Sequence, residues 1–314
     1  MAQAKRFFIH CLTIILIILS LEVSLRVFAA DLTCKSINPI LKVCGEYLKA
    51  EFDKDRFWRL DNEVPEDFIN ADFKIIVLSD SVSVMLEGSG YPEILEDFLL
   101  KKTQKNIKVF NAGVPGYTSY QGLLYFREML FTQPDLVIVN FGWNDHWCSI
   151  NGLEDKNQKF SRLFYIKRTI CSISKIFSLL DNLYFKINEK QYKIKLENLD
   201  LSVCKKRVSL EDYIENLREI IKICKERKVK VILMTAVYLD NESDWLDMHL
   251  KYNSAVRDIA KEENICLLDA VNLFKKSEAL FLEPDVDQCH INLKGSRILA
   301  QRLASIIETI LINN

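Results

Sequence analysis

The stretch Phe73–Ser83, FKIIVLSDSVS, begins as an apolar, β-branched run and ends in polar residues. The segment Ile75–Leu78 holds four apolar residues in succession, so both of its faces are suited to burial. Such a run, closed by a polar turn, predicts a central strand of a parallel sheet over Phe73–Leu78. Four later runs share this composition: 107–110, 136–141, 229–234 and 265–268.

Helical patterns separate these runs. In Tyr91–Lys102 the residues Ile94, Leu95, Phe98 and Leu99 share one face. Further helices are expected at 119–130, 209–228, 248–263 and 293–312. The alternation predicts an α/β protein, a three-layer α/β/α sandwich with a mainly parallel five-stranded sheet and right-handed crossovers.

We expect this domain to span residues 72–314, after a connecting segment at 31–71. An insertion at about 146–208 interrupts it, and within it Ser161–Leu180 has helical spacing of apolar residues, which we interpret as a cap over one end of the sheet. Its basic residues predict a solvated face, with contact to an anionic envelope polymer or lipid headgroup as the alternative. They are Lys167, Arg168, Lys175, Lys205, Lys206 and Arg207.

The N-terminal residues 1–30 differ from the rest of the chain in composition. Two basic residues precede Phe7–Leu21, an apolar run without an acid or a strong base. Its length lies between a signal-peptide core of ~7–15 residues and a spanning helix of ~20 residues. We therefore expect a signal anchor or a signal peptide that exports the rest of the chain and keeps the basic end cytoplasmic.

Two features bear on whether this segment is retained. Val27 and Ala29 form a usable small-residue cleavage site, after which the protein is secreted. Glu22 and Arg26 lie four residues apart and can pair on one helix face near the interface, which favours an uncleaved anchor. We therefore expect the chain to associate with the membrane through its N-terminal segment.

The composition of the chain argues against several other kinds of partner. The formal net charge is −1, so no global field favours nucleic acid, and no short-spaced Cys or His pairs suggest a metal site. We expect no cofactor. The chain has nine cysteines, which gain meaning in an exported protein. Cys34 and Cys44 are close enough in sequence to form a disulfide, although a small buried side chain is the commoner role of a cysteine.

The residues after each strand carry the chemistry, because ligands of open α/β sheets bind beyond the carboxyl ends of the strands. Ser81 follows the first strand, Gly113 the second and Asn144 the third. A loop beyond the fifth strand holds Asp287 and His290. A hydroxyl, a glycine, an amide and an imidazole at one edge form the inventory for acyl transfer.

These blocks resemble the SGNH (GDSL-like) serine hydrolases, a flavodoxin-like esterase and lipase family. Ser81 lies in a Gly-Asp-Ser-like block, Asn144 in a Gly-x-Asn-Asp block and His290 in an Asp-x-x-His block, with Gly113 between the first two. The resemblance covers roughly residues 72–314, and the N-terminal segment resembles that of membrane-anchored bacterial members. One departure is Ser79, where the family usually has glycine, and a turn that needs positive φ would lower activity there.

The resemblance and the chemistry imply the same roles. Ser81 is the nucleophile, His290 its base and Asp287 the group that orients the imidazole. The oxyanion hole is expected from the backbone N–H groups of Ser81 and Gly113 and the side-chain amide of Asn144. Each residue also has an ordinary structural alternative, since serine, glycine and asparagine are common in turns and helix caps.

Three functions fit this pattern. The first is an exported serine esterase that hydrolyses a small-molecule or glycan ester through an acyl-serine, for example an O-acetyl group on an envelope carbohydrate. The second is an O-acyltransferase with the same triad. The third is a non-catalytic glycan-binding module with the same fold. A nucleotide-binding domain is disfavoured, because no glycine-rich phosphate loop follows the first strand.

Other polar and aromatic residues receive no catalytic role. His146 and His249 are expected in exposed loops without a partner. Asp80 and Asp145 are expected as structural hydrogen-bond acceptors. Trp143 and Trp147 flank Asn144 and suit either a sugar or acyl pocket or core packing.

Overall fold

The computed structural model describes residues 2–29, 40–43, 46–60, 63–84, 90–103, 105–149, 152–197, 204–240, 245–274, 277–285 and 287–312. Its main sheet has five parallel strands in the order β6-β5-β7-β8-β9. Their bounds are β5 (Phe73–Ser79), β6 (Ile107–Asn111), β7 (Leu136–Asn140), β8 (Lys230–Met234) and β9 (Cys266–Leu268). Each expected strand is confirmed within two residues of its sequence bounds.

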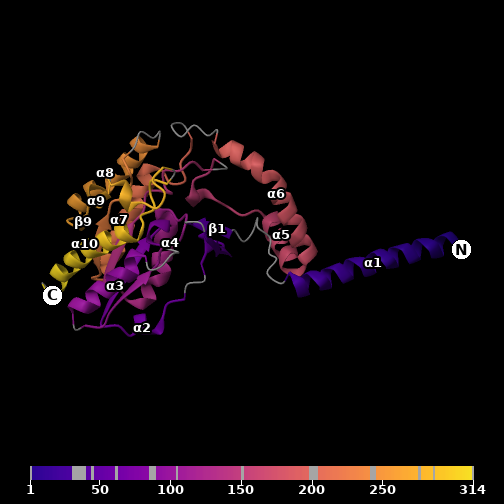
Figure 1. Cartoon of the computed structure of the whole chain (residues 1–314), viewed down its shortest axis with the longest axis horizontal. Helices are drawn as coiled ribbons and strands as arrows, with labels where there is room; N and C mark the ends of the chain where they lie inside the picture. The colour runs from indigo at the N-terminus through magenta and orange to yellow at the C-terminus, as the bar shows by residue number, and fades with distance from the viewer. Residues whose placement is uncertain are drawn as a thin grey trace.

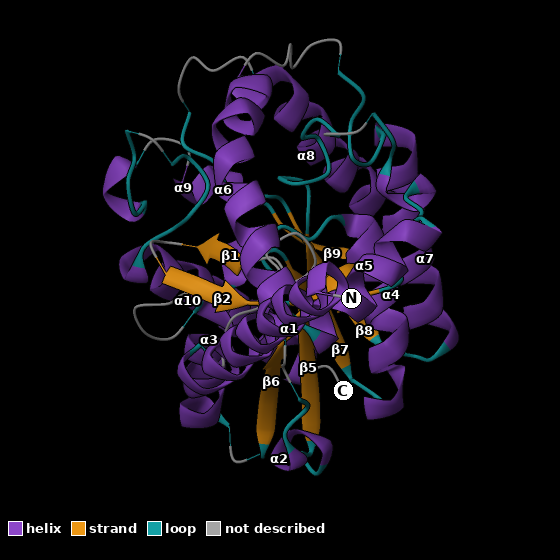
Figure 2. Ribbon diagram, turned by 90° about the vertical axis from the view of Figure 1, so that its right-hand side faces the viewer, coloured by secondary structure: helices purple, strands orange, loops and turns teal. Residues whose placement is uncertain are grey.

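Helices cover both faces of this sheet (Figure 2). One layer holds α3 (Tyr91–Lys102), α9 (Val271–Phe274) and α10 (Leu293–Ile312). The other holds α4 (Ser119–Met129), α7 (Leu210–Glu226) and α8 (Leu246–Glu262). Ile75 and Val77 pack with the first layer, while Ile76 and Leu78 pack with the second. This alternation explains why β5 is apolar at every central position, and the predicted three-layer sandwich is confirmed.

Two small antiparallel hairpins and a short helix occupy the stretch before the sheet. They are β1 (Ile40–Val43) with β2 (Glu46–Lys49), β3 (Glu51–Asp53) with β4 (Phe57–Arg59), and α2 (Glu66–Ile69). The second hairpin supports the loop after β6. Trp58 Nε1 donates a hydrogen bond to Pro115 O at 3.1 Å, and Tyr117 Oη donates to Trp58 O at 2.6 Å.

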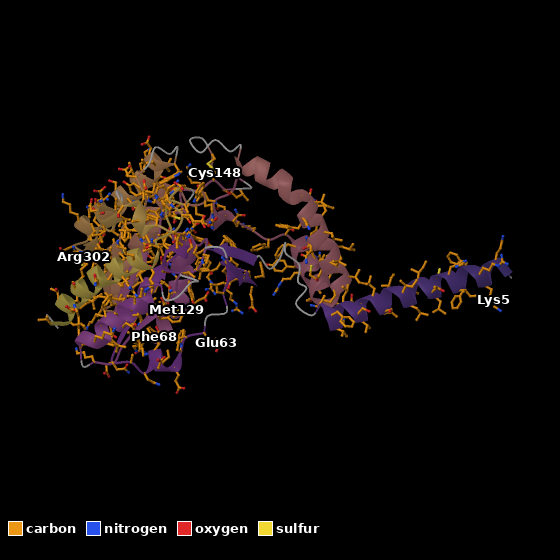
Figure 3. The ribbon with its side chains drawn as sticks, viewed as in Figure 1. Lys5, Glu63, Phe68, Met129, Cys148 and Arg302 are labelled. Atoms are coloured by element: carbon orange, nitrogen blue, oxygen red, sulfur yellow. A yellow bond between two sulfur atoms is a disulfide. The ribbon has the colours of Figure 1, made fainter. Side chains whose placement is uncertain are left out.

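The N-terminal helix α1 (Ala2–Phe28) projects away from the sheet domain (Figure 1). Within its segment Lys5–Phe28, an 18-residue window has a mean hydropathy of 2.3 and is not buried against the protein, so the segment is long and apolar enough to cross a membrane. Figure 3 shows Lys5 near the outer end of this helix. The Glu22–Arg26 pair forms as expected, at 2.9 Å, whereas the residue after Ala29 lies outside the described residues.

The insertion begins with η3 (Asp155–Asn157) and continues as two helices, α5 (Arg162–Ile173) and α6 (Lys175–Glu197), rather than one helix over 161–180. Ser174 separates them with φ −121° and ψ 118°, and its Oγ accepts the N–H of Phe177 at 3.2 Å. We call α5 and α6 the arm. The arm lies between α1 and the sheet domain (Figure 1), so it stands beside the domain instead of capping the sheet.

A disulfide closes the base of the insertion. Cys148 is bonded to Cys204, and the bridge is visible beside the Cys148 label in Figure 3. Cys171 of α5 is also disulfide-bonded. The suggested partners Cys34 and Cys44 lie outside the described residues. The cysteines that remain as thiols in the described part of the chain are Cys11, Cys224, Cys266 and Cys289.

Candidate active site

Ser81, His290 and Asp287 form a continuous hydrogen-bonded relay. His290 Nε2 lies 2.8 Å from Ser81 Oγ, and His290 Nδ1 lies 2.6 Å from Asp287 Oδ2. An ionised Asp287 can only accept, so Nδ1 carries the proton and Nε2 is left to accept the proton of the hydroxyl. The sequence places Ser81 and His290 209 residues apart. The fold brings them together because both lie beyond the carboxyl ends of parallel strands.

Ser81 is held at the start of a short 3₁₀ helix, η1 (Ser81–Ser83), directly after β5. Asp80 precedes it and its Oδ1 accepts the N–H of Val82 at 3.0 Å, which caps this turn. The N–H of Ser81 has no acceptor among the described residues. This N–H is therefore available to an oxyanion that forms beside Oγ.

The loop before α10 holds His290 in place. Asp287 Oδ1 accepts the backbone N–H groups of Cys289 at 3.1 Å and His290 at 3.0 Å, so the carboxylate is oriented by its own loop. Asn292 Oδ1 accepts from the N–H of Gly295 at 3.1 Å and begins α10, as the sequence predicts for a helix cap. The loop that carries His290 is thus ordered by the Asp287 turn before it and by the start of α10 after it.

The charges around His290 favour its protonated form. Burial opposes that form, but the hydrogen bond and charge of Asp287, together with the charge of Asp80, raise the pKa of His290 above 6.5. Burial also acts against ionised Asp287, and the contact with His290 outweighs it, so the pKa of Asp287 falls well below 3.8. The pair is electrostatically matched for a base that receives a proton during reaction.

Gly113 follows β6 at a point of close approach. A Cβ built there would lie 1.8 Å from Ser83 Oγ and 3.0 Å from Asp80 O, so only glycine fits. Its N–H donates to Asn111 Oδ1 at 3.0 Å. The expected oxyanion donor therefore already has an internal acceptor, which an oxyanion would have to replace.

Asn144 reaches the same region from the turn after β7. Its Nδ2 donates to Asp80 Oδ2 at 3.2 Å and to Tyr117 O at 3.0 Å. Two acceptors match the two amide hydrogens, so the side chain is fixed in place. The structure places Asn144 beside the turn that carries Ser81, with both of its amide hydrogens already donated.

Asp80 links these groups. It is fully buried, and burial raises its pKa to about 6 against the hydrogen bonds from Val82 and Asn144 and the attraction of His290. Its contacts agree with the structural acceptor role expected from the sequence. Ser79, one residue earlier, ends β5 and is not among the described residues with positive φ. The serine that replaces the family glycine is therefore accommodated without backbone strain.

The expectation for His146 and His249 is wrong. Both are buried, and His146 Nε2 lies 3.1 Å from His249 Nδ1. His249 Nε2 contacts Ala236 O at 3.1 Å and must donate to it, so His146 donates to His249. Burial lowers the pKa of His249 to about 4 and that of His146 well below 6.5. Sequence reasoning missed the pair because its two members are 103 residues apart.

The structure also shows the surroundings of Trp143, Asp145 and Arg207. Trp143 is buried, and its Nε1 donates to Val237 O at 2.8 Å, so it packs in the core. Asp145 is buried and its Oδ1 accepts from Ser119 N and Oγ, as expected of a structural acceptor. Arg207 does not lie on a solvated face. It pairs with Asp155 at 2.9 Å and donates to Gly116 O at 2.8 Å beside the site loop.

Cys289 is a further neighbour of the relay: its Sγ lies 3.3 Å from His290 Nδ1 and 3.4 Å from Asp287 Oδ1. In the described part of the chain, these three side chains are the one group whose donor atoms cluster tightly enough to hold a metal ion. Two of the three belong to the relay itself. The signal in the sequence was the adjacency of Cys289 to His290.

Comparison with known proteins identifies the family. The GDSL-like lipase/acylhydrolase family matches residues 80–298, which include Ser81, Gly113, Asn144 and His290. A search of curated protein sequences finds no match.

The chain is similar to several solved structures. An alpha/beta hydrolase from the metagenome of Lake Arreo, Spain, has a TM-score of 0.51 at 18% identity over 75% of this chain and 94% of that one. A lipase/acylhydrolase from Enterococcus faecalis has a TM-score of 0.49 at 18% identity over 76% and 96%. An acetylxylan esterase from Geobacillus stearothermophilus has 0.48 at 22% identity over 77% and 95%. With most of its length matched by the family and with the family's fold, this chain belongs to the GDSL-like lipase/acylhydrolases and is an ester hydrolase.

Proposed function

We propose that this chain is an exported, membrane-anchored serine esterase in which Ser81 is the nucleophile, His290 the general base and Asp287 the orienting acid. The supporting observation is the relay from Ser81 Oγ through His290 to Asp287, with contacts of 2.8 and 2.6 Å. A serine hydroxyl is a weak nucleophile alone, and such a relay is the usual means of activating it.

The reaction proceeds in two halves. Ser81 Oγ bonds to the ester carbonyl carbon while its proton passes to His290 Nε2. The bond to the alcohol oxygen then breaks, His290 gives the proton to the leaving alcohol, and acyl-Ser81 remains. Water repeats the sequence on the acyl-serine, so that its oxygen bonds to the acyl carbon and Ser81 recovers its proton as the carboxylic acid leaves.

The negative oxygen of each tetrahedral intermediate lies near three donors in this proposal: the N–H groups of Ser81 and Gly113 and the amide of Asn144. Only the first is unoccupied in the described structure, because Gly113 N–H bonds to Asn111 and Asn144 bonds to Asp80 and Tyr117. Substrate binding must therefore shift these acceptors or share their hydrogens.

The catalytic test uses 4-nitrophenyl esters of increasing acyl length and a fluorophosphonate probe. Wild-type protein is expected to hydrolyse at least one ester and to be labelled on Ser81. Ser81→Ala should lose the label and at least about 10³-fold in kcat. Equal turnover by folded Ser81→Ala would remove the serine mechanism, and a wild type that neither turns over nor labels would favour a binding module.

Export and anchoring are supported by α1 and by the Cys148–Cys204 bridge, since disulfides persist mainly outside the cytosol. An anchored esterase meets esters within reach of the membrane, and we propose O-acyl groups of envelope carbohydrate as its substrate class. Preference for acetyl over long-chain esters in the panel agrees with this class, whereas a long-chain optimum contradicts it. Partition of a labelled acetyl group between water and added sugar separates hydrolase from acyltransferase.

A further inference from the structure

The end of α1 is latched to the arm. Glu22 accepts the backbone N–H groups of Lys175 at 2.9 Å and Ile176 at 3.0 Å and the hydroxyl of Ser174 at 3.1 Å. These are donors at the start of α6, which have no partner within the helix, so Glu22 completes the N-terminus of α6.

Arg26 secures the same junction from the other side. It pairs with Glu22 and donates to Ile173 O, a carbonyl at the end of α5. One turn of α1 therefore satisfies the end of one arm helix and the start of the other. The arm is fixed at the C-terminal end of the apolar segment, and Figure 1 shows both helices beside that end.

The arm has an inverted polarity. On α6, Ser178 and Asp181 face inward and are buried, and Asp181 pairs there with Lys167 of α5 at 2.5 Å. Five larger apolar or aromatic side chains of α6 are instead exposed, whereas Ile176, Phe177 and Leu179 are half-buried. The exposed ones are Leu180, Leu183, Tyr184, Phe185 and Ile187, of which Ile187 is 77% exposed. A helix in water buries its apolar stripe and exposes its polar one, so this arrangement indicates apolar surroundings.

The neighbouring helix repeats the pattern. An apolar stripe at helical spacing runs along α5 and is exposed, with Leu163 at 75%. Its members are Leu163, Ile166, Ile170 and Ile173. The α5 stripe ends with Ile173 at the junction that Glu22 and Arg26 hold, and the α6 stripe starts at Leu180, four residues after Ile176.

Charge and continuity identify the occupant as a lipid surface. Residues 162–188 hold five basic side chains (at 162, 167, 168, 175 and 186) and one acidic side chain (at 181). A helix with exposed apolar residues and a basic excess is typical of a segment that lies in the interface of an anionic bilayer. The spanning segment of α1 ends at this arm, so the bilayer surface must pass close to it.

We propose that α5 and α6 are a monotopic membrane-binding arm whose apolar stripes enter the headgroup–acyl boundary of the bilayer that α1 spans. This inference rests on the membrane anchoring proposed above. The arm then sets the distance and orientation of the catalytic domain relative to the membrane, because it is tied to α1 at Glu22 and to the domain through the Cys148–Cys204 base.

The test reconstitutes the full chain in nanodiscs of phosphatidylcholine and phosphatidylglycerol. An environment-sensitive fluorescent amino acid replaces Leu163 or Ile187 in the arm, Ile15 in α1, or Phe131, an exposed apolar residue of η2 (Leu130–Thr132) in the sheet domain. Quenching is measured with nitroxide lipids labelled near the headgroup or deep in the chain, and with aqueous iodide.

At Leu163 and Ile187 we expect shallow nitroxide to quench at least about threefold more than iodide, and Phe131 should show the reverse. Iodide quenching at the arm equal to that at Phe131 would overturn the proposal. Protection from iodide without nitroxide quenching would also overturn it, because a protein partner then covers the stripes. The Ile15 probe separates the two ideas: deep quenching there with an unquenched arm leaves anchoring intact, and its absence removes anchoring as well.

Discussion

Asn144 Nδ2 donates a hydrogen bond to Asp80 Oδ2 at 3.2 Å, so a proposed oxyanion donor also satisfies a fully buried carboxyl group. Asn144→Ala should therefore have two consequences. Loss of the donor is expected to lower kcat by about 10²–10³-fold with little change in KM. Loss of the partner of Asp80 is expected to lower the free energy of unfolding by about 1–3 kcal/mol.

Steady-state kinetics and urea denaturation measure these two effects separately. Ser81→Ala is the matched control, because it removes catalysis without touching the Asn144–Asp80 contact. Wild-type kcat in folded Asn144→Ala would exclude Asn144 from the site, even if stability falls as expected.

The acid limb of the pH profile reports His290. Its pKa is raised above 6.5 by the hydrogen bond and charge of Asp287 and by the charge of Asp80, against burial. The protonated imidazole cannot accept the proton of Ser81, so kcat/KM should fall as the pH drops through this raised pKa. Asp287→Asn should shift that limb to lower pH and reduce kcat by as much as about 10⁴-fold.

The same contact acts on stability in a defined direction. A raised pKa in the folded state means that His290 contributes stability below pH 6.5, and this contribution is lost as the pH rises through the folded-state pKa. The lowered pKa of Asp287 contributes stability above 3.8 that is lost as the pH falls through its folded-state pKa. If the acid limb of the kcat/KM profile is unchanged in Asp287→Asn, Asp287 does not raise the pKa of His290 as proposed.

Cys289 should make the enzyme sensitive to thiol reagents. Its Sγ lies 3.3 Å from the imidazole nitrogen that pairs with Asp287, so we expect an added acetamide group to crowd this pair. Iodoacetamide is expected to inactivate the wild type. Cys289→Ala should retain ester turnover and resist inactivation, although Cys266 is still exposed to the reagent. Equal inactivation of both proteins would assign the effect to another thiol.

The site could be anticipated because it depends on strand ends. Phe73–Ser79 and Leu136–Asn140 are buried on both faces, as their apolar composition predicts. Because the strands are parallel, the residues that follow them lie at the same edge of the sheet. The length of the helix at 161–180 could not be anticipated. The break at Ser174 is stabilised by Glu22, which precedes Ser174 by 152 residues and lies in the apolar N-terminal helix.

Local sequence also could not show how the polar groups are satisfied. His146 and His249 have no evident partner in the sequence, but their imidazole rings are hydrogen-bonded to each other. Arg207 belongs to a basic run, yet its ion pair with Asp155 and its bond to Gly116 O make it a support of the loop after β6. Such pairings arise from the packing of distant segments, so composition and spacing carry no signal for them.

The Cys148–Cys204 disulfide offers a test of export that is independent of activity. It joins the loop that follows Asn144 to the residues before α7 and closes a span of 56 residues. Loop-closure entropy for this length corresponds to about 4 kcal/mol, so Cys148→Ser with Cys204→Ser should lower the free energy of unfolding by roughly that amount. In cells, thiol trapping with a maleimide-polyethylene glycol should show both cysteines protected in the full chain. Deletion of residues 2–28 should leave them reactive, because the reducing cytosol prevents the bridge. Protection in both proteins, or reactivity in both, would contradict export through the N-terminal helix.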